Sequence, residues 1–257
     1  MNILKMERKK IYKRPEYWFS YFILIIPLIL SLGFRFRNLG LDIDYNDPGE
    51  IAILTLVSIS IGLASSFVIY HVFFAVLATN ALSSELDNQY YTMYFPKMTS
   101  KPNLYTTKSL VLTEAWLLHF IAIVVFSFLC HGLISRGSTN ISNAFFDEYS
   151  YFFLANIIAI GMDVLSYSHL VLATGVFLPP FSNLMAGIGI IIIRIFLSDM
   201  PVLKYINPRY YLYILESQTE KTDYALVNNY LLLSLLMSLI IIVISQIIGR
   251  KYIKRER

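Results

Sequence analysis

The chain has 257 residues, of which 56% are hydrophobic, and its mean hydropathy is +0.59. This composition excludes a water-soluble globule of the same length, because such a protein needs a larger polar fraction to cover its surface. The formal net charge is +4, and the single cysteine, Cys130, excludes a disulfide within the chain.

Six apolar stretches follow one another along the chain, and each is long enough to cross a bilayer, which takes about 20 mainly apolar residues in a helix. The second and the fourth are longer than required, so we expect them to tilt, kink or project into water. The sequence therefore predicts an all-α membrane protein with six transmembrane helices in one domain, residues 1–257. The predicted spans are Tyr17 to Phe36, Ile51 to Thr79, Ser109 to Leu133, Tyr151 to Leu178, Asn183 to Met200 and Asn229 to Gly249.

Lysine and arginine divide unevenly between the polar segments, and the side that carries more of them is expected to face the cytoplasm. With both termini inside, fourteen of these residues lie on the inner side and six on the outer side. The usage of Ile, Lys, Asn and Tyr favours an AT-rich bacterial genome. We therefore predict a multi-pass protein of the bacterial plasma membrane with both termini in the cytoplasm.

The N-terminal leader, residues 1–16, is expected to form a short interfacial helix. Ile3, Leu4 and Ile11 lie on one side of this helix and lysines surround the rest. This pattern is typical of a helix that lies on an anionic inner leaflet, which makes membrane lipid an expected partner. The alternative is an ordinary anchor of the positive-inside kind.

A long inner loop, residues 80–108, separates the second span from the third. It combines the acidic residues Glu85 and Asp87 with the neighbouring aromatic residues Tyr90 and Tyr91. Loops of more than about 12 to 15 residues are usually functional or disordered, and the density of rings here argues against disorder. We expect a docking surface for a partner protein. The alternative is that this stretch is the water-exposed end of a long second helix.

The external segment, residues 198–228, is rich in proline and tyrosine. Such a segment favours a compact structure that lies along the membrane interface, because an unstructured loop would not need so many rings. Its prolines and tyrosines are Pro201, Tyr205, Pro208, Tyr210, Tyr211, Tyr213 and Tyr224.

These three segments together resemble the permease subunits of ABC-2 type exporters, a family of six-span proteins that pair with a separate ATPase. The resemblance covers nearly the whole chain, and the Asn-Pro signature before the last span is its most specific part. The matching residues are Glu7 and Pro27 near the N-terminus, Glu85, Ser100, Lys101, Leu104 and Lys108 in the inner loop, and Pro201, Asn207 and Pro208 in the external segment. The chain departs from the family at Gln89 and Tyr90, where members usually have Gly-Thr.

The resemblance implies a dimer of permease chains, identical or different, with each inner loop seated in a cleft of an ATPase subunit. It assigns ATP and magnesium to that partner and no cofactor or metal to this chain. Nucleic acid is not an expected partner. The expected coupling helix contains Glu85, Asp87, Tyr90, Tyr91, Ser100 and Lys101, and the expected external re-entrant helices carry Pro201, Asn207, Pro208 and Tyr210.

Asp163 and Arg194 are the ionisable residues farthest from either predicted membrane surface. Counted along their helices, they lie about 21 Å and 17 Å from the inner ends of spans four and five, which a tight turn joins. An unpaired charge at that depth costs about 3 kcal/mol or more, so the sequence predicts an ion pair. The pair could hold the two helices together, or it could belong to a proton or substrate path.

Histidines are scattered along the spans without the spacing of metal ligands. His71, His119 and His131 are therefore expected to be polar packing residues, and His169 is a candidate partner for Glu114.

The sequence bears on three classes of function. If the chain belongs to an ATP-driven exporter, another polypeptide must bind the ATP, because this sequence has no GxxxxGK[ST] loop. A proton- or ion-coupled secondary transporter would use Asp163 and Arg194, although neither a half-repeat nor corresponding broken helices are evident. An intramembrane enzyme is not supported, because the chain contains no HExxH or GxSxG motif. The apolar faces of the spans favour an amphipathic peptide, antimicrobial or toxin as cargo, with a lipid or polysaccharide as the alternative.

Overall fold

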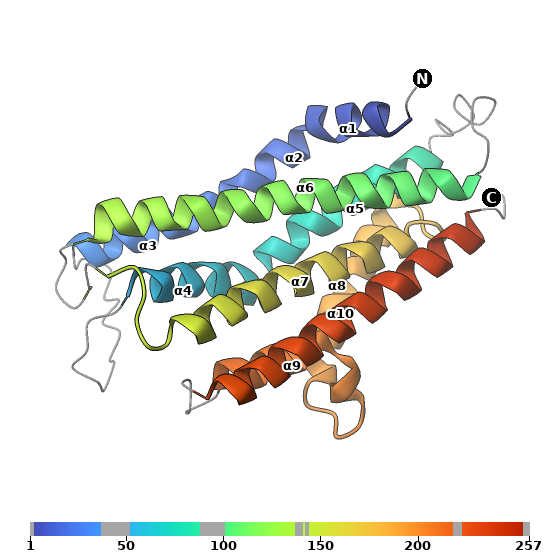
Figure 1. Ribbon diagram of the computed structural model, residues 1–257. Helices are drawn as coiled ribbons and strands as arrows, with labels where there is room; N and C mark the ends of the chain where they lie inside the picture. Colours follow the sequence, from blue (N-terminus) through green and yellow to red (C-terminus); the bar gives the residue numbers. More distant parts are fainter. Residues whose placement is uncertain are drawn as a thin grey trace.

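The computed structural model describes residues 3–36, 52–87, 101–136, 141, 144–217 and 223–253, and every regular element in these ranges is helical (Figure 1). The elements are, in chain order, α1 (Ile3–Lys13), α2 (Pro15–Ser20), the 3-10 turn η1 (Tyr21–Leu24), α3 (Ile25–Phe36), α4 (Ile53–Ser66), α5 (Ile69–Asp87), α6 (Lys101–Cys130), the π-helical turn η4 (His131–Ser135), α7 (Ser150–Thr174), α8 (Pro180–Leu197), the 3-10 turn η5 (Leu203–Ile206), α9 (Pro208–Ser217) and α10 (Tyr224–Tyr252).

Within these ranges, five helical segments are long and apolar enough to cross a membrane, and the bent pair of α4 and α5 adds a sixth if the pair counts as one span. The first of the five, residues 15–36, is formed jointly by α2, η1 and α3. The prediction of a helical protein is confirmed in the part of the chain that the structure describes, and the length and apolar character of these helices are consistent with an all-α membrane protein.

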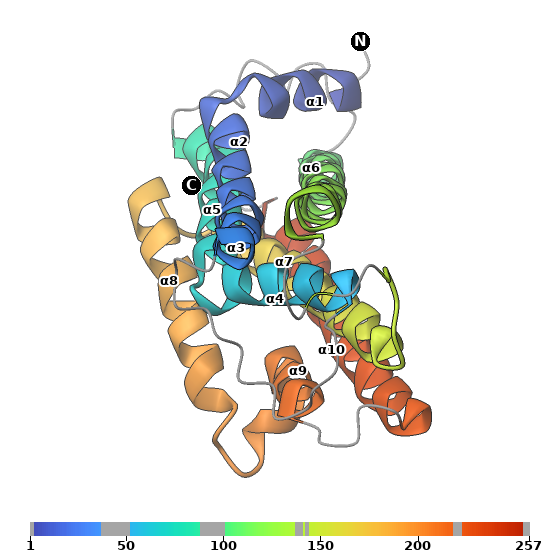
Figure 2. The same cartoon turned by 90° about the vertical axis from the view of Figure 1, so that its left-hand side faces the viewer.

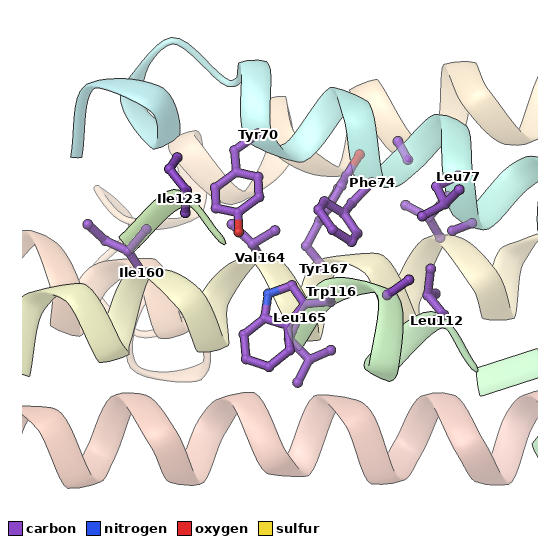
Figure 3. Packing of buried hydrophobic residues seen from close by; sticks show 14 of the residues in the cluster. Tyr70, Phe74, Leu77, Leu112, Trp116, Ile123, Ile160, Val164, Leu165 and Tyr167 are labelled. Carbon is purple, nitrogen blue, oxygen red and sulfur yellow. The ribbon is translucent and has the colours of Figure 1, made fainter. Parts of the chain in front are cut away.

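The helix α7 lies at the centre of the bundle, in contact with α4, α5, α6, α8, α9 and α10. In its most apolar 18-residue stretch, 78% of the residues are buried, against 33% or less in the other four long helices. Those helices turn large apolar side chains outward, as expected where lipid replaces water as the solvent. Figure 3 shows the centre of the core, where α5, α6 and α7 interdigitate through Tyr70, Phe74, Leu77, Leu112, Trp116, Ile123, Ile160, Val164, Leu165 and Tyr167.

Both termini lie at the same end of the bundle, together with the end of α5 and the start of α6 (Figure 1). We call this the inner end, following the charge distribution, and the opposite end the outer end. Viewed along the bundle, α1 lies across one flank beside α2 and α6, whereas α9 lies on the opposite side next to α10 (Figure 2). This arrangement agrees with the predicted placement of both termini on one side of a membrane.

The second predicted span, Ile51 to Thr79, is not one continuous helix. Its two parts, α4 and α5, meet at an angle of 59°, and Val68 at the break has a φ of 61°. A positive φ is costly for a β-branched residue, so the surrounding packing holds this bend. The first backbone N–H groups of α4 find acceptors in the segment before α7, since Ile53 and Leu54 donate to the carbonyls of Ala144 and Phe145.

The predicted inner loop, residues 80–108, is largely helical. α5 continues to Asp87 and α6 begins at Lys101, so the alternative of a long second helix is correct for residues 80–87. The connection that is left, residues 88–100, lies outside the described residues. The inner turn between α7 and α8 is as expected: Pro179 caps α8 and Pro180 is its first residue, where its missing N–H has no cost.

Candidate functional site

Five charged side chains from α1, the α1–α2 junction, α5 and α6 meet at the inner end of the bundle. We call this group the inner network, and it consists of Glu7, Lys10, Arg14, Glu85 and Lys108.

Lys108 lies at the centre of the inner network and is only 2% exposed. Its ammonium group donates to Glu7 Oε2 at 2.8 Å, to Glu85 Oε2 at 2.7 Å and to the carbonyl of Ala81 at 2.7 Å. These three acceptors satisfy all three donors of a lysine. The buried cation is therefore fully compensated, and it ties α1 to both α5 and α6.

Two further cations complete the inner network. Lys10 donates to Glu7 Oε1 at 2.9 Å and to Glu85 Oε2 at 3.1 Å, and Arg14 donates to Glu85 Oε1 at 3.0 Å. Burial lowers the pKa of Lys10, but the hydrogen bonds and charges of Glu7 and Glu85 outweigh it and raise the pKa overall. Glu85 thus accepts hydrogen bonds from Lys10, Arg14 and Lys108, and these contacts hold the end of α5 against the leader helix.

Two more polar contacts join the leader segment to the same helices. Arg8 forms a bidentate pair with Glu114 on α6 that is partly exposed, and Asn80 on α5 donates to Glu16 at 2.9 Å. The predicted pairing of Glu114 with His169 is therefore wrong. The ring of His169 is held instead by hydroxyls of α6 one turn apart, at 3.1 Å from Ser109 and 3.0 Å from Thr113.

The expected coupling residues differ in whether their side chains are buried or exposed. The Glu85 carboxylate is engaged inside the protein, whereas Asp87 is exposed at the last position of α5. Lys101 opens α6, and Tyr90, Tyr91 and Ser100 lie outside the described residues.

A second buried polar group, which we call the outer cluster, consists of His71, Asp163, Arg194 and Asn207. Arg194 on α8 pairs with Asp163 Oδ1 on α7, and His71 on α5 donates from Nε2 to Asp163 Oδ2 at 3.1 Å. Asp163 is 1% exposed and Arg194 7%. The structure thus brings together the two charges whose matched depths predict an ion pair, and it adds His71 as a further partner.

Asn207 connects this pair to the external segment. Its side-chain amide donates to the carbonyl of Arg194 at 2.6 Å and to Ser198 Oγ at 2.9 Å. Its Oδ1 accepts from Arg194 Nε at 3.3 Å and from the backbone N–H of Arg209 at 3.2 Å. The Asn-Pro motif and the intramembrane pair, which sequence reasoning treats as two separate features, therefore form one structural unit.

The other residues of the external motif shape the chain around Asn207. Pro201 lies in an exposed turn after α8, and Pro208 is the first residue of α9. Tyr210 packs edge-on against Tyr205 at 5.6 Å between ring centroids, and Lys204 Nζ lies 5.0 Å from the centroid of the Tyr210 ring. The external segment contains two short helical elements, η5 and α9, and α9 packs against α7 and α10. That they are re-entrant stays a prediction.

The remaining histidines of the spans join helices through neutral polar contacts. His131 lies 2.9 Å from Ser31 Oγ and 2.8 Å from Ser60 Oγ, which links η4 to α3 and α4. His119 lies 3.0 Å from the carbonyl oxygen of Ser20. Among the described residues, no group of three or more His, Cys, Asp and Glu side chains is arranged to hold a metal ion.

No protein-family model, curated protein or solved structure matches this chain. The inner network and the outer cluster are therefore the features that bear on function. Neither has the arrangement of a nucleophile and a general base around a cleft. The inner network joins three helices mechanically, and the outer cluster anchors the external segment to the centre of the bundle.

Proposed function

We propose that this chain is the membrane-spanning permease subunit of an ABC-2 type exporter and that a separate ATPase drives it. The inner network is the observation that carries the proposal. It clamps the leader helix to the two helices that flank the inner connection, residues 88–100, where the resemblance to ABC-2 permeases places the contact with an ATPase.

The geometry suits a chain that receives mechanical work at its inner end. Lys108 joins α1, α5 and α6, so a force applied to the connection between α5 and α6 would act on all three helices together. Asp87, exposed at the end of α5, would lie at the edge of the docking surface. Glu85 would act within the permease as part of the clamp rather than as a contact to the ATPase.

The rest of the assembly follows from the same proposal. The sequence has no GxxxxGK[ST] loop, so ATP and magnesium would be bound by the partner subunit. Six spans would supply half of a pathway, and a second permease chain, identical or different, would supply the other half. The cargo would be an amphipathic peptide, antimicrobial or toxin, because the sequence of the spans offers aliphatic and aromatic faces rather than a charged corridor.

The proposal is tested by purifying the tagged full chain from its own membranes into lipid nanodiscs. Native mass spectrometry should find two permease chains and two copies of an ATPase subunit, and photoreactive ATP should label the ATPase subunit alone. Asp87→Arg should reduce the amount of bound ATPase and the vanadate-sensitive ATP hydrolysis. Glu148→Arg, which reverses an exposed charge at the outer end, is the matched control and should change neither. A chain that transports cargo without any ATPase would refute the proposal.

A second candidate, a proton-coupled secondary transporter, is favoured by one observation. The break between α4 and α5 lies three residues before His71, which pairs with Asp163 in the outer cluster. A broken helix beside ionisable groups is a feature of such transporters, which usually carry a second break at a corresponding position. In proteoliposomes without ATP, a pH gradient alone should then drive uptake of a fluorescent amphipathic peptide, and Asp163→Asn should abolish it. The exporter proposal predicts no uptake under these conditions.

A further inference from the structure

The leader helix α1 has two chemically different sides. Its inner side carries Glu7 and Ile11, which are buried against the bundle. Its outer side carries Lys5, Lys9 and Lys13, spaced four residues apart, and all three are exposed. At 100° per residue, this stripe is centred about 180° from the buried side.

These three lysines are not used by the inner network. Lys10 and Arg14 face the carboxylates of Glu7 and Glu85, and Arg8 pairs with Glu114. Within the described residues, no carboxylate pairs with Lys5, Lys9 or Lys13. Like charges four residues apart repel one another along a helix, so the stripe is disfavoured unless anions lie beside it.

The position of α1 along α6 indicates the depth at which Lys5, Lys9 and Lys13 would lie relative to a bilayer. α1 contacts α6 from Lys108 to Glu114, which is about 10 to 20 Å from the inner end of that helix. The apolar segment Asn103–Ser135 has 33 residues and is therefore about 50 Å long, some 20 Å longer than the hydrocarbon core of a bilayer. If its outer end reaches the outer interface, α1 lies where α6 emerges among the inner headgroups.

Aromatic side chains next to α1 agree with this level. Trp18 is 63% exposed, and its Nε1 donates to the backbone carbonyl of Tyr12 at 2.8 Å. Phe19, the next residue, and Phe22, one turn further on, are also exposed and stack on each other. Tryptophan and other rings concentrate at the membrane–water interface, where one part of the side chain is in hydrocarbon and another near water.

We propose that Lys5, Lys9 and Lys13 form a docking surface for anionic phospholipid headgroups of the inner leaflet. The inner network holds α1 from its opposite side, so the three ammonium groups are presented in a row without further ordering of the helix. The stripe distinguishes this surface from a general positive-inside anchor, because it assigns lipid binding to three of the basic residues of the leader and excludes the three that pair with carboxylates. The surface is independent of whether an ATPase drives the protein.

Trp18 provides a local reporter for the test. The full chain with Trp116→Phe, which leaves Trp18 as the one tryptophan, is reconstituted into nanodiscs of phosphatidylcholine with a minor fraction of brominated phosphatidylglycerol or brominated phosphatidylcholine. Bromine quenches tryptophan on contact, so the ratio of the two quenching constants reports the local preference for the anionic lipid. Each lysine near an anionic surface should strengthen association about fivefold, and three of them up to about a hundredfold.

The expected result is preferential quenching by brominated phosphatidylglycerol. Lys5→Gln/Lys9→Gln/Lys13→Gln should lose the preference, and Lys5→Arg/Lys9→Arg/Lys13→Arg should keep it. The control Arg250→Gln/Lys251→Gln removes two exposed cations from the inner end of α10, outside the α1 stripe, and should also keep it.

Salt provides a test that needs no lysine variant. Raising the ionic strength from 0.1 M to 1 M shortens the Debye length from about 10 Å to about 3 Å, so the preference of the Trp116→Phe chain should fall. Equal quenching by both lipids at low salt, or a preference that survives in the triple Gln variant, would overturn the proposal. Loss of the preference on adding millimolar inorganic phosphate at constant ionic strength would also overturn it, since the stripe would then bind phosphate itself rather than a lipid surface.

Discussion

Removing one partner of the buried ion pair in the outer cluster should destabilise the protein more than removing both. Asp163→Asn leaves the Arg194 guanidinium buried without a carboxylate, and Arg194→Met leaves Asp163 with His71 as its remaining partner. Each single change strands a charge at a cost of about 3 kcal/mol. At about 2 to 4 °C per kcal/mol for a chain of this size, the thermal midpoint should fall by about 6 to 12 °C.

The double variant Asp163→Asn/Arg194→Met should recover most of this loss, because neither charge is left in the interior. The external segment should remain attached, since the Asn207 amide donates to the backbone carbonyl of residue 194, a hydrogen bond that does not depend on the Arg194 side chain. The coupling energy of the cycle therefore reports the charge interaction and not the loss of the Asn207 anchor.

The measurement is thermal unfolding of the four proteins in identical nanodiscs, followed by tryptophan fluorescence. Arg8 and Glu114 offer a control pair of the same chemistry that is partly exposed, and a matched cycle of Arg8→Met and Glu114→Gln should change the midpoint far less. Additive losses for Asp163 and Arg194 would show that the two side chains do not meet, and the packing of α7 against α8 described above would be wrong.

Three further predictions concern stability, measured in the same way. Lys108→Met should cost about 3 kcal/mol, because it removes the most buried of the cations that Glu7 and Glu85 share and leaves them only Lys10 and Arg14, and limited proteolysis should then release the leader helix. Val68→Gly should leave stability unchanged or raise it by about 1 kcal/mol by relieving the positive φ, whereas Val72→Gly, inside α5, should lower it by about 0.5 kcal/mol; equal losses at both positions would contradict the strained break. Gly249→Ala should destabilise the protein, since its Cβ would lie 2.0 Å from a buried tyrosine ring on α6, while Gly189→Ala, whose Cβ meets nothing within 4 Å, should be neutral or stabilising.

The membrane-spanning helices were predictable because lipid imposes a simple rule on sequence. Every backbone polar group in hydrocarbon must be satisfied within the segment, so apolar stretches of sufficient length become helices. The bend between α4 and α5 was not predictable in the same way. Val68 is neither Gly nor Pro, and its positive φ is held by tertiary contacts that a local pattern does not contain. The end of α5 at Asp87 agrees with the alternative of a long second helix, whereas the expected end of the span at Thr79 rests only on the polar residues that follow it.

The candidate site was predictable from the sequence only where a charged residue lies in an apolar span, because burying an unpaired charge there costs a large free energy. Asp163 and Arg194 stand out because a lone charge in hydrocarbon requires a partner, and counting along the helices matched their depths. The sequence places Lys108 and Glu85 in a predicted loop, where charged side chains need no partner. It therefore does not predict that both residues are buried in contact with the leader helix or its partners. A signal for His71 exists: it lies fourteen residues before Glu85, which places both side chains on nearly the same face of one helix.

That spacing makes α5 the element that joins the two polar groups. Glu85 at its inner end belongs to the inner network, and His71, about 21 Å along the helix, contacts Asp163 in the outer cluster. A helix of this length is stiff, and the break at Val68 separates it from α4, so α5 could move as a rigid rod about that point. Under the proposed function, motion at the inner connection would reach the Asp163–Arg194 pair, and through Asn207 the external segment, by displacement of this single helix. A double-mutant cycle between Lys108→Met and Asn207→Ala tests this link in the exporter complex, read out as vanadate-sensitive ATP hydrolysis. The two residues share no partner, so additive effects on hydrolysis would show that α5 does not couple the two ends of the bundle.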